Sequence, residues 1–196
     1  MKTIYTIGYA MYRTPEEMIK DLRMFNVTCL VDVRSMPYSA IRPEFNREAL
    51  AESLKAAGIL YRNYAKEFGA RQEGDKFQNA EHAVDFDKFA RTEEFLSGIQ
   101  KLIRGTELGY VFVLMCAEKD PMECHRSILI GRHLKEIGFT VEHIRENARL
   151  ENQEEMEIRA IGNQVSMFDD GNPIARFYRE QGARIAYRGK PDSQPD

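Results

Sequence analysis

The sequence contains no tryptophan and only three cysteines among its 196 residues. Three cysteines are too few for a disulfide framework, and such a content is typical of a protein from the reducing cytoplasm. No apolar run approaches the roughly 20 residues that a membrane-spanning helix needs. The amino terminus, MKTIYTIGYA, has one lysine and no long apolar stretch, so it does not read as a signal peptide. These absences predict a cytoplasmic protein that does not enter a membrane.

The chain also lacks a strong charge of either sign. Its formal net charge is −3, and residues 151–196 hold 9 acidic and 6 basic residues, which leaves 22 of each kind in residues 1–150. A neutral body argues against broad, non-specific binding of nucleic acid, although a local basic groove stays compatible with it.

Three motifs of known chemistry are missing. The first predicted strand is not followed by G-x-G-x-x-G, and neither the phosphate loop G-x-x-x-x-G-K-[ST] nor the nucleophile elbow G-x-S-x-G occurs. The sequence therefore gives no motif support for a dinucleotide or a Walker-type nucleotide site, and it predicts no cofactor.

Strand-like and helix-like stretches alternate along the first 145 residues. Short runs rich in β-formers are followed by stretches with helix-capping residues and helical spacing of apolar side chains. The predicted strands are residues 2–7, 28–33, 59–64, 110–115 and 140–144. This rhythm predicts an α/β fold, a single three-layer domain with a mostly parallel sheet of about five strands covered on both faces.

We expect this domain to cover residues 1–149. From about residue 150 the chain is more polar and loses clear periodicity. Residues 150–196 are therefore predicted to form a C-terminal appendage that either drapes over the domain or stays mobile.

The most informative stretch is residues 110–138, YVFVLMCAEKDPMECHRSILIGRHLKEIG. After an apolar strand, Asp120 is a good helix cap, Pro121 suits the first helical position and Glu123 completes a capping box. The predicted helix ends at Gly138. In α/β sheets, ligands bind where a strand ends and the next helix begins, and a helix N-terminus favours an anion.

Five chemically active side chains gather at this junction: Cys116, Glu118, Cys124, His125 and Arg126. A thiol near a helix N-terminus, beside an imidazole and a guanidinium, acquires thiolate character. Cys124 and His125 are therefore candidate catalytic residues, with Glu118 as a candidate general base. Cys116 and Arg126 are candidates for ligand binding.

Two alternatives to this interpretation stay open. Cys124 is equally compatible with a small buried residue at a close helix contact. Metal binding is the remaining possibility, but the C-x7-C-H spacing matches no structural zinc pattern, and we predict no metal site.

A second polar group, Asp32, Arg34 and Ser35, follows the predicted strand 28–33. A buried aspartate is costly unless it is paired, and Arg34 points to the same side of an extended chain. In the functional interpretation, Arg34 and Ser35 bind a phosphate or carboxylate while Asp32 holds the arginine. In the alternative, the ion pair only fixes the loop.

Several segments together resemble the DUF488 family: YTIGYA, LVDVRSMPYS, GILYRNY with EFGAR after it, and LMCAEKDPMECHRSILIGRHL. The resemblance covers about residues 3–145, and C-A-E-x-x-P-x-x-C-H-R is its most specific part. It implies an α/β domain but no established activity. Family members often have a histidine where this chain has Tyr9 and a glycine where it has Ala70, so a step that needs a histidine at position 9 cannot operate here.

A separate resemblance lies in the predicted appendage. Residues 164–168, QVSMF, are similar to the pentapeptide that binds the bacterial DNA sliding clamp, commonly written Q-L-[S/D]-L-F. The resemblance implies that Met167 and Phe168 enter an apolar pocket while the Gln164 amide hydrogen-bonds beside them. Alternatively, these apolar side chains pack on their own domain.

Two functions follow from these residues. The first is an enzyme that acts on a phosphate-bearing or nucleotide- or nucleic-acid-related ligand, recruited to DNA replication or repair by its tail. The second is a non-catalytic adaptor or nucleic-acid accessory protein. A metal-binding enzyme is the third choice.

Overall fold

The computed structural model describes residues 2–72, 77, 83–162 and 172–188. Within this part of the chain, six strands form one sheet in the order β3-β2-β4-β1-β5-β6. The strands are β1 (Thr3–Gly8), β2 (Cys29–Asp32), β3 (Leu60–Asn63), β4 (Phe112–Cys116), β5 (Thr140–Ile144) and β6 (Leu150–Asn152). The first five are parallel, and β6 pairs antiparallel with β5. The α/β fold and the five predicted strands are confirmed, whereas β6 was not predicted.

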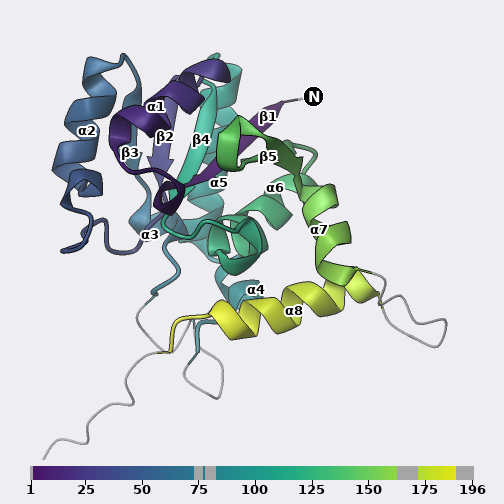
Figure 1. Cartoon of the computed structure of the whole chain (residues 1–196). Helices are drawn as coiled ribbons and strands as arrows, with labels where there is room; N and C mark the ends of the chain where they lie inside the picture. Colours follow the sequence, from purple (N-terminus) through teal and green to yellow (C-terminus); the bar gives the residue numbers. More distant parts are fainter. Residues whose placement is uncertain (1, 73–76, 78–82, 163–171, 189–196) are drawn as a thin grey trace, which may run out of the picture.

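Helices cover both faces of the sheet (Figure 1). The α-helices of five or more residues are α1 (Pro15–Met24), α2 (Arg47–Ala56), α5 (Glu93–Glu107), α6 (Arg132–Glu136), α7 (Gln153–Ile161) and α8 (Pro173–Ile185). Apolar residues of α1 and α2 pack with one face of the strands, and those of α5 and α6 pack with the other. The short helices are α3 (Ala65–Phe68), α4 (Phe86–Phe89), η1 (Tyr9–Met11), η2 (Pro43–Phe45), η4 (Pro121–Glu123), η5 (Arg126–Gly131) and η6 (Glu146–Ala148).

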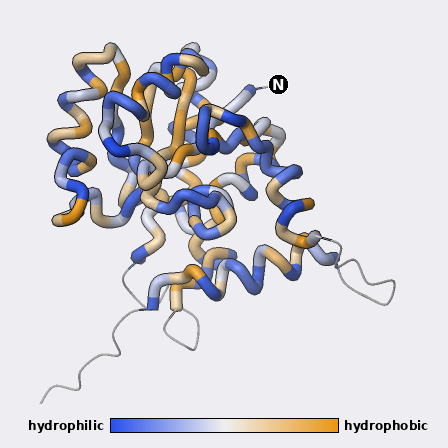
Figure 2. Tube along the Cα trace, viewed as in Figure 1, coloured by the Kyte–Doolittle hydropathy of each residue, from blue (hydrophilic) through white to orange (hydrophobic). Residues whose placement is uncertain are grey.

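The central strands have the composition that two-sided burial requires. Every residue of β2 and of β4 is buried, as expected for parallel strands covered by helices on both faces. Leu30 belongs to the core on the side of α1, and its neighbour Val31 belongs to the core on the side of α5. Figure 2 accordingly shows hydrophobic residues along the central strands, with hydrophilic residues spread over the surrounding helices.

Threonine side chains cap the starts of α1 and α5. The Thr14 hydroxyl accepts a hydrogen bond from the Glu17 amide at the start of α1, and Thr92 does the same for α5. Asn46 precedes α2, but its side chain accepts from the Ser39 amide, 2.6 Å away, instead of capping the helix.

The predicted single helix from Asp120 to Gly138 is wrong. Asp120 caps only the 3₁₀ turn η4, and Cys124 then takes an extended conformation with φ −140° and ψ 138°. Its carbonyl accepts from the amides of Ser127 and Ile128, both 3.1 Å away, and so starts the π-helix η5 that leads into α6. Cys124 therefore lies before the helix and not within its first turns.

The segment predicted as an appendage contributes packed elements. Strand β6 extends the sheet, and Met156 of α7 is completely buried. Tyr178 of α8 is buried, and its hydroxyl donates to Glu157 at 2.6 Å and accepts from Gln153 at 2.7 Å. In Figure 1, α8 runs below the sheet and beside α4. No helix in the described ranges is long and apolar enough to cross a membrane.

The end of β1 passes very close to the loop after β4. A Cβ atom added at Gly8 would lie 1.8 Å from the carbonyl oxygen of Glu118, closer than any real contact. We therefore predict that Gly8→Ala lowers the free energy of unfolding by about 1–3 kcal/mol or more, because the two backbones must separate. Urea unfolding measures this change.

Gly182→Ala is the matched control. Its added Cβ would make an ordinary contact with Phe86 at 3.4 Å inside helix α8, where alanine is favoured over glycine by up to about 1 kcal/mol. Equal stability losses in the two variants would contradict the close approach at Gly8.

Candidate functional site

Two thiols and one imidazole meet at the carboxyl end of β4. Cys116 is the last residue of β4, and the extended backbone of Cys124 brings the second thiol beside it. The Nδ1 atom of His125 lies 3.9 Å from Cys116 Sγ and 3.8 Å from Cys124 Sγ. All three residues are buried, and both cysteines are free thiols.

The imidazole is oriented by a neighbouring strand. Its Nε2 atom lies 2.9 Å from the carbonyl oxygen of Val33, the residue that follows β2. Because a carbonyl can only accept a hydrogen bond, Nε2 carries the proton and Nδ1 faces the two sulfurs. The pairing of β2 with β4 brings the Val33 carbonyl close to the thiols, since Asp32 of β2 stands opposite Met115 of β4.

The cluster favours a thiolate at Cys124. Burial alone raises the pKa of the Cys124 thiol. The hydrogen bond from Cys116 and the charges of Arg126 and His125 outweigh burial and bring the pKa well below its ordinary value. The pKa of Cys116 is raised, first by its hydrogen bond to Cys124 and then by burial. Burial lowers the pKa of His125, but the Cys124 thiolate outweighs burial and leaves it raised. Thiolate character at Cys124 stays a prediction, and its basis is now the neighbouring charges and not a helix N-terminus.

Glu118 connects the cluster with the surface. The residue is exposed, and its carboxyl group interacts electrostatically with the Cys124 thiolate. Removal of the carboxylate from water and the nearby Cys124 thiolate raise the pKa of Glu118 above its usual value. A carboxyl group in this position is able to exchange protons with the cluster and with a ligand at the surface.

Arg126 is turned inward and holds the loop after β4. Its guanidinium donates to the carbonyl oxygens of Glu118 at 2.8 Å and Lys119 at 3.2 Å, and the residue is only 1% exposed. Among the described residues, its Nε atom has no hydrogen-bond partner. This position favours a structural role over the predicted contact with a ligand.

Asp32 and Arg34 form a buried, bidentate ion pair. Arg34 Nε and Nη2 lie 2.9 and 2.6 Å from the two carboxylate oxygens, and Nη2 also donates to the carbonyl oxygen of Phe45. Tyr61 donates its hydroxyl hydrogen to the same aspartate at 2.7 Å. The Ser35 hydroxyl accepts from the Arg71 amide at 2.8 Å. These internal bonds favour the structural interpretation of Asp32, Arg34 and Ser35.

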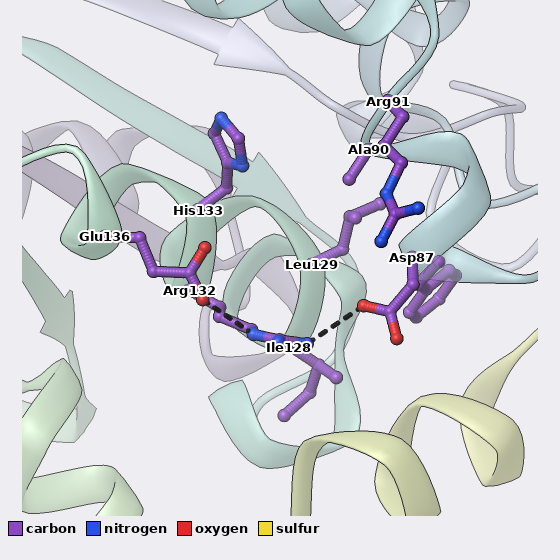
Figure 3. Close-up of a pocket in the computed structure, with 9 residues that line it drawn as sticks. Asp87, Ala90, Arg91, Ile128, Leu129, Arg132, His133 and Glu136 are labelled. Carbon is purple, nitrogen blue, oxygen red and sulfur yellow. Dashed lines mark hydrogen bonds and ion pairs between the residues drawn. The ribbon is translucent and has the colours of Figure 1, made fainter. Parts of the chain in front are cut away.

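One cavity lies away from this chemistry, between α4 and the η5–α6 helix (Figure 3). Its volume is about 260 Å³. Arg132 crosses its floor and is already paired with Asp87 at 3.1 Å and with Glu136 at 3.0 Å. None of the site residues predicted from the sequence lines this cavity. Because the charge of Arg132 is compensated by two carboxylates, we assign no anionic ligand to it.

A larger cavity of about 520 Å³ lies at the carboxyl edge of the sheet. The loops after β1, β4 and β5 line it with Met11, Lys119, Asp120, Arg145, Glu146, Asn147 and Arg149. Sequence reasoning missed the residues that the β5–β6 loop contributes. This loop is conformationally unusual, because Asn147 and Ala148 both have positive φ, at 59° and 53°. The sequence pattern does not indicate such a conformation.

The buried ion pair predicts a specific stability loss. Asp32→Asn keeps the shape of the side chain but leaves Arg34 without its carboxylate, so we expect the free energy of unfolding to fall by about 3–5 kcal/mol in urea denaturation. Lys2→Ala is the control, since it breaks a surface pair with Glu107 that is worth at most about 1 kcal/mol. A loss in Asp32→Asn no larger than in the control would exclude a stabilising role for the pair.

Comparison with known proteins gives one result. Residues 14–149 match the family model of DUF488, which is described as a domain of unknown function. Comparisons with curated proteins and with solved structures found no significant match. The matched range contains β2 to β5 and the whole cluster of Cys116, Cys124 and His125. This chain, with its thiols and imidazole at the carboxyl end of β4, belongs to the DUF488 family.

Proposed function

We propose that the protein is an enzyme that binds a phosphate-bearing small molecule, such as a nucleotide, at the carboxyl edge of its sheet. Glu118, Cys124 and His125 are the reactive groups. The observation that carries the proposal is the 520 Å³ cavity, which has the volume of a small-molecule site and begins at the residue after Glu118.

The charges around this cavity favour an anion. Arg145 is held by Asp120 at 3.2 Å, so its charge is compensated. Lys119 makes only an exposed contact of 3.7 Å with Glu146, and such pairs are weak. Arg149 is exposed and has no ion pair within the described part of the chain. Lys119 and Arg149 are therefore the cations that we assign to a phosphate group.

The cavity and the reactive groups share one loop. Glu118 and Lys119 are neighbours in the chain, and Arg126 fixes both of their carbonyl groups. The η1 turn runs alongside, because the Ala10 amide donates to the Ala117 carbonyl at 3.1 Å. We infer that a ligand bound by Lys119 lies beside the loop that carries Glu118. We therefore assign anion binding to Lys119 and Arg149 at the rim of the cavity, and not to Arg34 and Arg126, whose hydrogen-bond donors are largely used within the protein.

Arg149→Gln tests the proposal directly. We expect the affinity for inorganic phosphate and for nucleoside monophosphates, measured by isothermal titration, to fall about tenfold or more, because a charge-assisted hydrogen bond contributes roughly 1.5–3 kcal/mol. Arg23→Gln is the control, since Arg23 lies on α1 beside a different hollow. Wild-type protein that binds none of these anions, or equal losses in both variants, would contradict the proposal.

A second candidate function is the adaptor, and it depends on residues 164–168, which lie outside the described residues. The flanking helices are described: α7 ends at Ile161 and α8 begins at Pro173, and they pack against each other. We infer that a sliding clamp would have to bind a segment that is connected to the domain at both ends, and not a free tail.

The pentapeptide gives a clear prediction for the full-length chain. Met167→Ala with Phe168→Ala should abolish binding to a bacterial sliding clamp, for which we expect micromolar affinity, because each apolar side chain contributes roughly 1.5–3 kcal/mol. Binding is measured by titration and the melting temperature by calorimetry. If the double variant instead lowers the melting temperature by many degrees, these side chains belong to the core and the adaptor function is excluded.

A further inference from the structure

We propose that Cys116, Cys124 and His125 bind a thiol-seeking divalent metal ion, with Zn²⁺ as the expected ion. The ligand atoms would be the two sulfurs and Nδ1 of His125. The inference deepens the proposed function, on which its catalytic meaning rests, but metal binding itself is measured separately from binding of a phosphate.

The spacing of the three ligand atoms fits one ion. Tetrahedral Zn²⁺, with bonds of about 2.3 Å to sulfur and about 2.0–2.1 Å to nitrogen, places a sulfur and a nitrogen ligand about 3.6 Å apart. The observed Sγ–Nδ1 distances are 3.9 and 3.8 Å, and all three atoms lie within 4.8 Å of one another. For the two sulfur–nitrogen pairs, closing around an ion requires shifts of only a few tenths of an ångström.

The histidine is oriented as a metal ligand would be. Metal-binding histidines usually donate their second ring nitrogen to a carboxylate or a backbone carbonyl, which fixes the ring and leaves the other nitrogen free to coordinate. His125 has this arrangement, with Nε2 at 2.9 Å from the Val33 carbonyl and Nδ1 directed at both sulfurs. The carbonyl comes from a different strand, so the orientation is built by the fold.

The backbone at Cys124 supports the same inference. A continuous helix would carry Cys124 on its first turns, but the chain adopts an extended residue between η4 and η5. This break places Cys124 Sγ beside Cys116, and the Arg126 amide lies 3.5 Å from that sulfur. Amide donors of this kind stabilise a metal-bound thiolate.

The ligand set fits a catalytic site better than a structural one. Structural zinc sites are closed by four protein ligands, whereas catalytic sites use three and keep one position for water or substrate. Here three buried ligands are present, and Glu118, two residues after Cys116, is exposed. The fourth position of such an ion would be left for water or substrate. Two thiolates and one imidazole favour Zn²⁺ over Mg²⁺ or Ca²⁺.

The test uses the full-length protein, freed of metal with a chelator under reducing conditions and titrated with Co²⁺ and then Zn²⁺. We expect one Co²⁺ per chain, with a thiolate-to-cobalt charge-transfer band that Zn²⁺ abolishes by displacement. Elemental analysis of the Zn²⁺-loaded protein gives the stoichiometry independently.

Matched variants assign the ligands. Cys116→Ser and His125→Gln should weaken Zn²⁺ binding by more than about 100-fold, because each removes a direct ligand. Cys29→Ser and His133→Gln should not, since Cys29 is a buried thiol of β2 and His133 lies on α6, both outside the cluster. Zn²⁺ should raise the melting temperature of the wild type and of these two controls.

The wild-type titration decides the question even if a ligand variant fails to fold. Wild-type protein that binds neither Co²⁺ nor Zn²⁺ at micromolar concentrations, or whose charge-transfer band survives unchanged in Cys116→Ser, overturns the inference. Metal binding without any phosphate binding would support this inference while removing the proposed ligand, and phosphate binding without metal would do the reverse.

Discussion

The carboxyl edge of the sheet depends on the guanidinium of Arg126. A buried cation is costly, and here two backbone carbonyl oxygens, of Glu118 and Lys119, accept its hydrogen bonds. Because Arg126 belongs to η5, these bonds tie the loop after β4 to the helix that follows. Gly8 must lie against the same loop, where no side chain fits. Arg126 thus holds the backbone of Glu118 and of Lys119, the residue that lines the cavity.

Two loops then build the site across neighbouring strands. The loop after β4 supplies the thiols, and the loop after β2 supplies the Val33 carbonyl that orients His125. The β2 loop is fixed in turn by the buried pair of Asp32 and Arg34. Arginines that the sequence suggested as ligand-binding groups thus keep two loops in place, while the exposed cations lie on the rim.

The sequence was sufficient for elements with strong local signals. Buried parallel strands such as β4 have long apolar runs, and Thr14 and Thr92 mark helix starts. It was insufficient for β6, whose three residues carry no alternation, and for the break at Cys124, where a good capping pattern led into a 3₁₀ turn. The spacing rule for zinc could not indicate that the thiols of Cys116 and Cys124 meet, because Cys116 ends a strand and Cys124 follows a turn. Their separation in sequence therefore does not reflect their distance in space.

The acceptor that orients His125 is a main-chain carbonyl, and this affects which substitutions the site tolerates in evolution. A carboxylate acceptor would be lost through a single codon change, whereas every amino acid at position 33 supplies the same oxygen atom. Substitutions of Val33 therefore act on His125 only when they displace the end of β2. The histidine's orientation is thus protected from most point mutations at its partner, and sequence drift there is limited by packing and not by chemistry.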